Sequence, residues 1–86
     1  MIKKYRKKPV VIEAIQYRGE ENIASCLNFC DEMIFNPKTN EYEIETLEGN
    51  LPVSKGDFII KGVAGEFYLC KPDIFKLTHE LVTEEG

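Results

Sequence analysis

The distribution of apolar and polar residues along the chain predicts a succession of short β-strands. Residues Glu41–Leu47 alternate, with Tyr42, Ile44 and Thr46 on one side and glutamates on the other, as in a strand with one solvated, acidic face. Residues Val10–Tyr17 are rich in β-branched side chains and carry apolar residues on both faces. They predict an interior strand, or one covered by a helix on one side and a partner on the other.

The segment Ser54–Phe75 predicts a β-hairpin around which the second half of the chain is organised. Lys55–Asp57 forms the turn into it, and Phe58–Ile60 is an apolar run suited to a strand buried on both faces. The glycines of Lys61–Gly65 reverse the chain, because glycine adopts positive φ without a steric cost. Glu66–Lys71 is the expected returning strand, which a Pro-Asp pair then ends.

One stretch, Glu20–Cys30, has helical periodicity instead. Its residues Ile23, Cys26, Leu27 and Cys30 recur at spacings of three and four, which places them on one face of a helix. Two glutamates stand at the N-terminal end, where the helix dipole favours negative charge. A helix this short needs a sheet to pack against.

The remaining segments predict short elements separated by turns. Met33–Phe35 is a short strand that ends at the polar loop Asn36–Asn40. Glu48–Asn50 is a tight turn, and Leu51–Ser54 is a short strand whose proline implies an edge or a bulge. Ile74–Val82 predicts a helical turn followed by a last strand. In that strand the residues Phe75, Leu77, His79 and Leu81 alternate with polar residues.

Together these elements predict one α+β domain over residues 1–86. Runs of hairpins with a single helix favour a small curved antiparallel sheet or open barrel, of five to seven short strands, with the helix packed on it. Residues 1–8 form a basic arm, and residues 54–75 form the central hairpin. A chain of 86 residues buries a modest core, so a homodimer or larger assembly that covers a sheet edge would add stability.

Charge divides the chain into two parts. Residues 1–8 carry five Lys or Arg and no acid, whereas residues 9–86 carry six bases and fifteen acids, and the whole chain has a net charge of −4. The arm could hold phosphates of a nucleic acid or of a small anion. It could equally be solvated, or pair with acidic residues of its own fold or of a neighbouring subunit. The acidic body disfavours extended nucleic acid as a partner.

No catalytic or metal-binding signature stands out in the sequence. Cys26 and Cys30 lie one helical turn apart, but only Cys70 and His79 remain as further soft ligands, and a zinc site needs four. Core packing explains the three cysteines better, and they are expected to be reduced thiols. No apolar run reaches the length of a membrane span. We therefore expect a soluble, unexported protein that is not an enzyme and has no cofactor.

The aromatic residues suggest the only candidate binding surface. Tyrosines and phenylalanines are numerous for a small sheet, and they could form a stacking platform for a nucleotide whose phosphates are held by lysines. The alternative is an ordinary core whose tyrosine hydroxyls stay in water. The glutamates of Glu41–Leu47 are too widely spaced to share one calcium ion and indicate a solvated face or a docking surface for the arm. The candidate ligand-binding residues are Lys7, Lys8, Lys61, Tyr68 and Lys71.

Two long phrases resemble a family of small phage and prophage proteins. These are Lys4–Tyr17, read as KYRKKPVVIEAIQY, and Ser54–Phe75, which contains GDFIIKG, GEFYLC and KPDIF; Glu45–Gly49 resembles the family's middle hairpin. Gly56–Phe58 is also similar to the core of the PGDYG domain, with Ser54-Lys55 in place of its proline-proximal lead. The resemblance implies a small phage accessory protein made in the cytoplasm of a host bacterium. It implies no particular activity.

The sequence thus predicts a non-enzymatic phage accessory protein that binds a host protein or sequesters a small anionic ligand such as a nucleotide. Counter-defence is one concrete form, in which the arm and the aromatic hairpin hold a nucleotide signal between subunits. The alternative is a structural or assembly protein of a phage that oligomerises through an exposed sheet edge.

Overall fold

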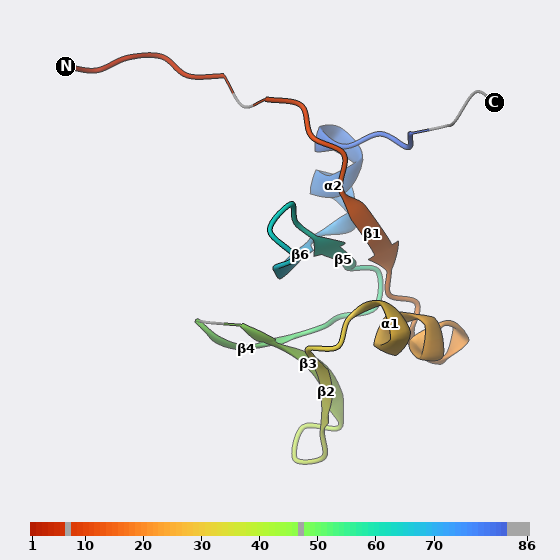
Figure 1. Cartoon of the computed structure of the whole chain (residues 1–86). Helices are drawn as coiled ribbons and strands as arrows, with labels where there is room; N and C mark the ends of the chain where they lie inside the picture. Colours follow the sequence, from red (N-terminus) through yellow and green to blue (C-terminus); the bar gives the residue numbers. More distant parts are fainter. Residues whose placement is uncertain (7, 47, 83–86) are drawn as a thin grey trace.

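The chain forms two small antiparallel sheets and two short helices. The structure, a computed structural model, describes residues 1–6, 8–46 and 48–82. Its strands pair in two three-stranded sheets, ordered β1-β5-β6 and β2-β3-β4 (Figure 1). The fold is therefore mixed α+β, and the sheets do not close into a barrel. The elements are β1 (Glu13–Gln16), the 3-10 helix η1 (Gly19–Glu21), α1 (Ile23–Phe29), β2 (Met33–Asn36), β3 (Glu41–Thr46), β4 (Gly49–Pro52), β5 (Phe58–Lys61), β6 (Phe67–Cys70) and α2 (Pro72–Thr78).

The central hairpin forms as its sequence predicts. Strands β5 and β6 pair antiparallel, with Ile60 opposite Tyr68. The Gly62 N–H donates to the carbonyl oxygen of Glu66 at 2.7 Å, which closes the hairpin, and Gly65 has a φ of 83°. A side chain at Gly65 would be strained at this φ, so glycine is used here for the reversal. Gly62 and Gly65 are turn residues between strands.

The second sheet is a meander of β2, β3 and β4. The Asn36 side chain accepts a hydrogen bond from the Lys38 N–H at 2.9 Å, as turn residues of this type do. Strand β3 confirms the predicted alternation, since Ile44 is fully buried whereas Glu41 and Glu45 are exposed. Strand β4 begins two residues before the predicted strand, at Gly49. Leu47, the predicted end of the preceding strand, lies outside the described residues.

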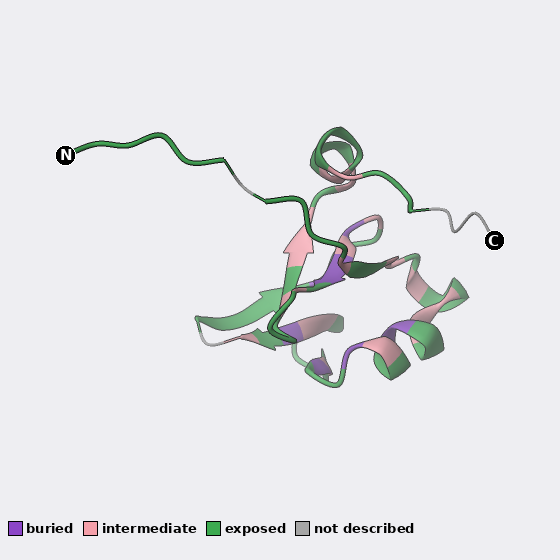
Figure 2. Ribbon diagram, turned by 45° about the horizontal axis from the view of Figure 1, so that its top comes forward, coloured by how far each residue is buried: buried purple, intermediate pink, exposed green. Residues whose placement is uncertain are grey.

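The hydrophobic core lies between the two sheets and includes α1 (Figure 2). Ile59 of β5 and Ile44 of β3 are both fully buried there, although they belong to different sheets. Phe29 at the end of α1 contacts Phe67 of β6 edge to face, with ring centres 5.8 Å apart. The helix and the inner faces of both sheets therefore share one core. Its buried residues are Cys26, Cys30, Met33, Ile44, Val53 and Ile59.

The C-terminal segment differs from its prediction in part. The predicted helical turn is present and belongs to a second helix, α2, but the last strand expected to follow it does not form among the described residues. Pro72 occupies the first turn of α2, where its missing N–H costs nothing. Phe75 stacks on Phe58 of β5 at 3.8 Å, and His79 stacks on Phe75 at 4.4 Å. Phe75 and His79 are four residues apart, so their contact follows the spacing of a helix. The alternation of apolar and polar residues in this segment is instead typical of a strand.

The N-terminal segment also differs from its prediction. The predicted strand Val10–Tyr17 shortens to Glu13–Gln16, and it lies at the edge of its sheet, not in the interior. The cause is the length of its partner, because β5 ends at Lys61, directly opposite Glu13. Residues before Glu13 therefore have no strand beside them in the described chain, and Val10 and Val11 are exposed.

Candidate functional site

The structure places the predicted ligand-binding residues at separate positions. Lys8 lies on the exposed N-terminal arm, and Lys7 lies outside the described residues. Tyr68 faces the same side of its sheet as Ile60, its partner in the register. Lys61 follows Ile60 in β5 and therefore projects from the opposite face. Tyr68 and Lys61 thus do not share a surface.

Lys71 is at the other end of the hairpin from Lys61. It contacts Asp57, which precedes β5, whereas Lys61 ends β5. Four residues of extended chain separate Asp57 from Lys61, a distance of about 13 Å. Consequently, the predicted set is not gathered into one pocket.

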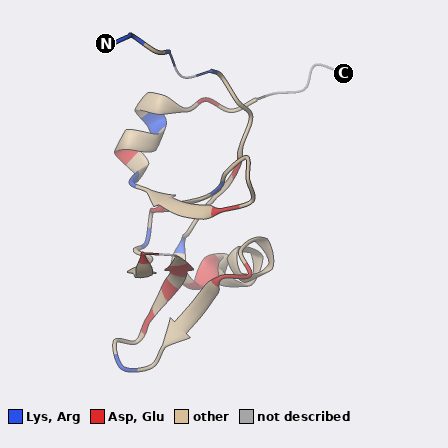
Figure 3. Cartoon of the chain, turned by 60° about the vertical axis from the view of Figure 1, so that its left-hand side comes forward, with Lys and Arg blue, Asp and Glu red and all other residues tan. Residues whose placement is uncertain are grey.

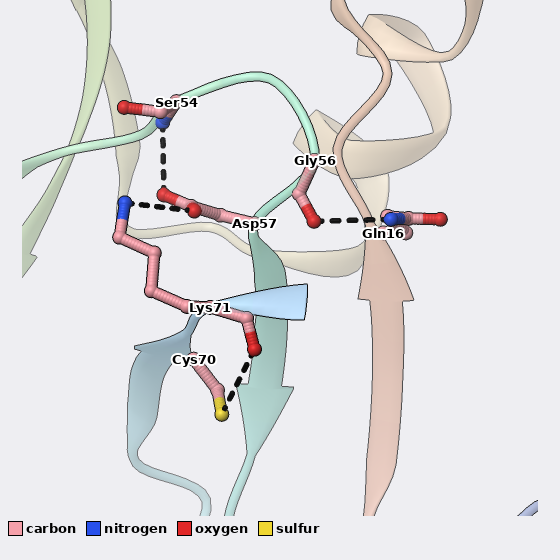
Figure 4. A network of polar contacts seen from close by, with 6 residues as sticks. All are labelled: Gln16, Ser54, Gly56, Asp57, Cys70 and Lys71. Atoms are coloured by element: carbon pink, nitrogen blue, oxygen red, sulfur yellow. Dashed lines mark hydrogen bonds and ion pairs between the residues drawn. The ribbon is translucent and has the colours of Figure 1, made fainter. Parts of the chain in front are cut away.

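The contact of Lys71 with Asp57 supports the turn before β5 (Figure 4). Asp57 is 3% exposed, and its Oδ1 accepts a hydrogen bond from the Lys71 Nζ at 3.0 Å. Its Oδ2 accepts one from the Ser54 N–H, also at 3.0 Å. Gln16 of β1 donates from Nε2 to the Gly56 carbonyl oxygen at 3.0 Å, which ties the same turn to the neighbouring strand. Lys71 neutralises a buried carboxylate, so its first role is structural.

A cleft at another position does bring functional groups together. It has a volume of about 610 Å³ and lies where the chain leaves β1, next to the hairpin of β2 and β3. This volume is within the usual range of small-ligand and side-chain sites. Its lining residues are Tyr17, Gly19, Glu20, Ile23, Phe35, Asn40, Glu41, Tyr42, Val53, Ser54 and Lys55. We call it the aromatic cleft.

Three aromatic rings form a connected row in this cleft. Tyr42 contacts Phe35 at 5.1 Å between ring centres and Tyr17 at 6.4 Å, both with the planes at 64°. The register of β2 with β3 places Phe35 opposite Tyr42. Burial raises the pKa of the Tyr17 hydroxyl, and the neighbouring Tyr42 raises it further. The Tyr17 hydroxyl therefore remains a protonated donor at neutral pH.

The charged residues of the cleft have an acidic balance. Glu20 comes from η1 and Glu41 from the start of β3, and both line the cleft with Lys55. The stem of Lys55 runs beside Gly19, where an added Cβ would lie 3.6 Å from its Cε. Two carboxylates and one ammonium give this surface a net negative charge. Together with three aromatic rings, that composition suits a cationic group better than a phosphate.

No thiol and no imidazole is among the described residues that line the aromatic cleft. Cys26 and Cys30 are fully buried, and burial raises the pKa of both thiols, so they are unreactive at neutral pH. His79 stacks on Phe75 at the outer face of the first sheet. Within residues 1–6, 8–46 and 48–82, no three His, Cys, Asp or Glu side chains gather as metal ligands. No helix in this described part is long and apolar enough to cross a membrane.

The sequence interpretation noted several cleft residues without bringing them together. Tyr17 and Tyr42 counted as aromatics of a possible platform, and Glu41 as part of an acidic strand. Phe35 could have been placed next to Tyr42 from the turn between their strands, because a hairpin fixes which residues are opposite. The approach of Tyr17 has no local signal, since it depends on how the two sheets pack.

No protein family, curated protein or solved structure was found to match this chain.

Proposed function

We propose that this chain is a non-enzymatic binding protein whose aromatic cleft binds a basic segment of a protein partner. The observation that supports this is the row of Tyr17, Tyr42 and Phe35 in one cleft with Glu20 and Glu41. A Lys or Arg cation over an aromatic face gains about 0.5–2 kcal/mol. A carboxylate within reach adds a charge-assisted hydrogen bond. Both kinds of group favour a cation on the ligand.

Sequestration of a small anion has less support from this geometry. Among the described residues that line the cleft, Lys55 is the only base. Lys8, Lys61 and Tyr68 do not line it, and Lys71 already neutralises Asp57. A phosphate in the cleft would therefore lie near two carboxylates with one compensating ammonium. A protein partner fits the charges better than a nucleotide does.

The biological setting is part of the proposal. The resemblance to small phage proteins supports an accessory role in the cytoplasm of a host bacterium. In that setting the cleft would engage an exposed Lys- or Arg-bearing segment of a protein. One cleft of this size contacts few side chains, so the affinity of an isolated segment is expected to be modest.

Calorimetric titration with two short blocked peptides tests this function. One peptide alternates lysine with alanine, and the other alternates glutamate with alanine. We expect saturable binding of the lysine peptide only, with amide chemical-shift changes at Tyr17, Phe35 and Tyr42 in a parallel NMR titration. Saturable binding of a nucleoside triphosphate with no binding of the lysine peptide would contradict the proposal and favour the anionic ligand.

Matched variants locate the binding surface. Glu41→Gln removes one cleft carboxylate, and Phe35→Ala removes an aromatic face from a residue that is 46% exposed, so the fold should tolerate both. Each substitution should raise the Kd for the lysine peptide about threefold or more, because it removes one cation–π or charged contact. Glu45→Gln, on the same strand but outside the cleft, is the control. Equal weakening by Glu45→Gln would show general charge attraction instead of a site.

A further inference from the structure

We infer that the basic segment bound by the aromatic cleft is the N-terminal arm of a second copy of this chain, so that two chains exchange arms in a homodimer. The inference rests on the function proposed above, because it names the ligand of the same cleft. Each copy presents both halves of the contact. A two-fold arrangement would therefore form two identical arm–cleft contacts.

The described part of the arm, residues 1–6 and 8, is exposed in the single chain. On the N-terminal side of β1 the chain runs away from both sheets (Figure 1). Ile2 is 99% and Tyr5 89% exposed. None of the hydrogen bonds or ion pairs of the described residues involves residues 1–6 or 8–12. Apolar and aromatic side chains held in water in this way gain free energy when another surface covers them.

The surface of the chain is too large for a compact monomer. The accessible area is 7337 Å², whereas a folded monomer of this mass exposes about 5200 Å². The radius of gyration is 14.8 Å, compared with about 12 Å for a compact domain of this length. A stable interface buries about 800 Å² on each partner. The excess of about 2100 Å² is therefore enough for one.

Charge makes a second copy a fitting partner for the arm. The arm carries five bases and no acid, and residues 9–86 carry a net charge of −9. Acidic residues lie along β3 and just before α1, whereas the charged residues of the N-terminal arm are basic (Figure 3). Glu20 and Glu41 line the cleft beside three aromatic rings, which suit the side chains of Lys4, Tyr5 and Arg6.

The connection to β1 favours exchange over folding back. The arm joins the Glu13 end of β1, whereas the cleft begins at Tyr17, beyond the other end. Pro9 and the β-branched run Val10–Ile12 favour extended backbone, so a reversal there is disfavoured. In extended chain, Lys8 and Tyr17 are nine residue steps apart, a span of about 30 Å. An extended arm therefore leads away from its own cleft and toward a neighbour.

Charge reversal in two full-length variants tests the exchange. The arm variant becomes acidic at four positions, and the cleft variant becomes basic at two. Far-UV circular dichroism checks that both remain folded, and analytical ultracentrifugation at low salt gives the mass. The substitutions are Lys3→Glu, Lys4→Glu, Arg6→Glu and Lys8→Glu in the arm variant, and Glu20→Lys and Glu41→Lys in the cleft variant.

The expected masses follow from which charges meet. The wild-type chain should sediment at twice the chain mass of 9.9 kDa. Each variant alone should sediment as a monomer, because its arm and cleft carry the same sign. An equimolar mixture should recover the doubled mass, because each arm then meets a cleft of opposite charge. Only an exchange between chains predicts this recovery.

Other outcomes separate this inference from the proposed function. A monomeric wild-type chain that binds the lysine–alanine peptide would overturn the exchange and leave the cleft function standing. A dimer that survives both charge reversals but is lost on Leu77→Glu would overturn it too, because the interface would then involve the exposed apolar side of α2. A dimer with no peptide binding and no recovery in the mixture would overturn both proposals.

Discussion

The two sheets contain three strands each, but their middle strands have different surroundings. In β5, the middle strand of β1-β5-β6, the adjacent residues Ile59 and Ile60 are both fully buried. Ile59 joins the core between the sheets, and Ile60 lies on the face where Phe58 stacks with Phe75 of α2. Strand β3, the middle of the second sheet, buries Ile44 and exposes Glu41 and Glu45 to solvent.

Because of this difference, we expect the first sheet to contribute mainly to stability and the second sheet mainly to recognition. The middle strand of the first sheet is covered on both faces, so substitutions of its buried residues should act on folding. The second sheet is covered on one face, and Phe35, Glu41 and Tyr42 at its hairpin end line the aromatic cleft. Residues that remain partly exposed in this way are available to a ligand. Three further experiments test this contrast, apart from the tests of binding and of exchange above.

The largest expected effect comes from Ile59→Ala in the first sheet. Truncating a fully buried isoleucine should lower the free energy of unfolding by about 2–5 kcal/mol, which is much of the stability of a small domain. Leu51→Ala in β4 is the comparison, because Leu51 is 40% exposed, and it should cost less than about 1 kcal/mol. Urea denaturation followed by circular dichroism measures both. Equal losses would show that the two sheets contribute alike.

A smaller effect is expected from Lys71→Met. The substitution leaves the buried Asp57 carboxylate with only the Ser54 N–H, at 3.0 Å. The cost should be about 1 kcal/mol, the low end for an unpaired buried group, because the Lys71 side chain is 61% exposed. Lys71→Arg should retain most of the stability. Asn50→Ala, which removes a 3.3 Å bond to Glu43 in the second sheet, is the exposed control; a loss as large as that of Lys71→Met would contradict this account.

The smallest effect is a loss of stability at alkaline pH, which the buried thiols of Cys26 and Cys30 should cause. Burial raises the pKa of both in the folded chain. Above the ordinary thiol pKa of 9.0 the unfolded chain therefore releases protons that the folded chain keeps, and stability falls as the pH rises. Urea titrations from pH 7 upward measure the slope. Cys26→Ala with Cys30→Ala should flatten it, whereas Cys70→Ala, at a partly exposed position, should not. An unchanged slope in the double variant would exclude the thiols as its cause.

The sequence predicted the elements whose partners are close along the chain. The β5–β6 hairpin and strand β3 follow from glycine turns and strict alternation, both of which are local. The N-terminal strand and the C-terminal segment were predicted less well. The length of β1 depends on where β5 ends, and the helix that contains Phe75 packs its ring on Phe58, a contact distant in the sequence. The candidate ligand-binding set stays a prediction, and within it Lys61 and Tyr68 project from opposite faces of one hairpin.

By itself the sequence determined the α+β class, the two-sided burial of Phe58–Ile60 and the division into a basic arm and an acidic body. These follow from residue order, because turn chemistry, alternation and charge need no distant partner. Only the tertiary structure decided that the strands form two sheets. It also placed Tyr17 beside Tyr42 and paired Lys71 with the buried carboxylate of Asp57. Such contacts join residues far apart in the chain, and packing between elements selects them.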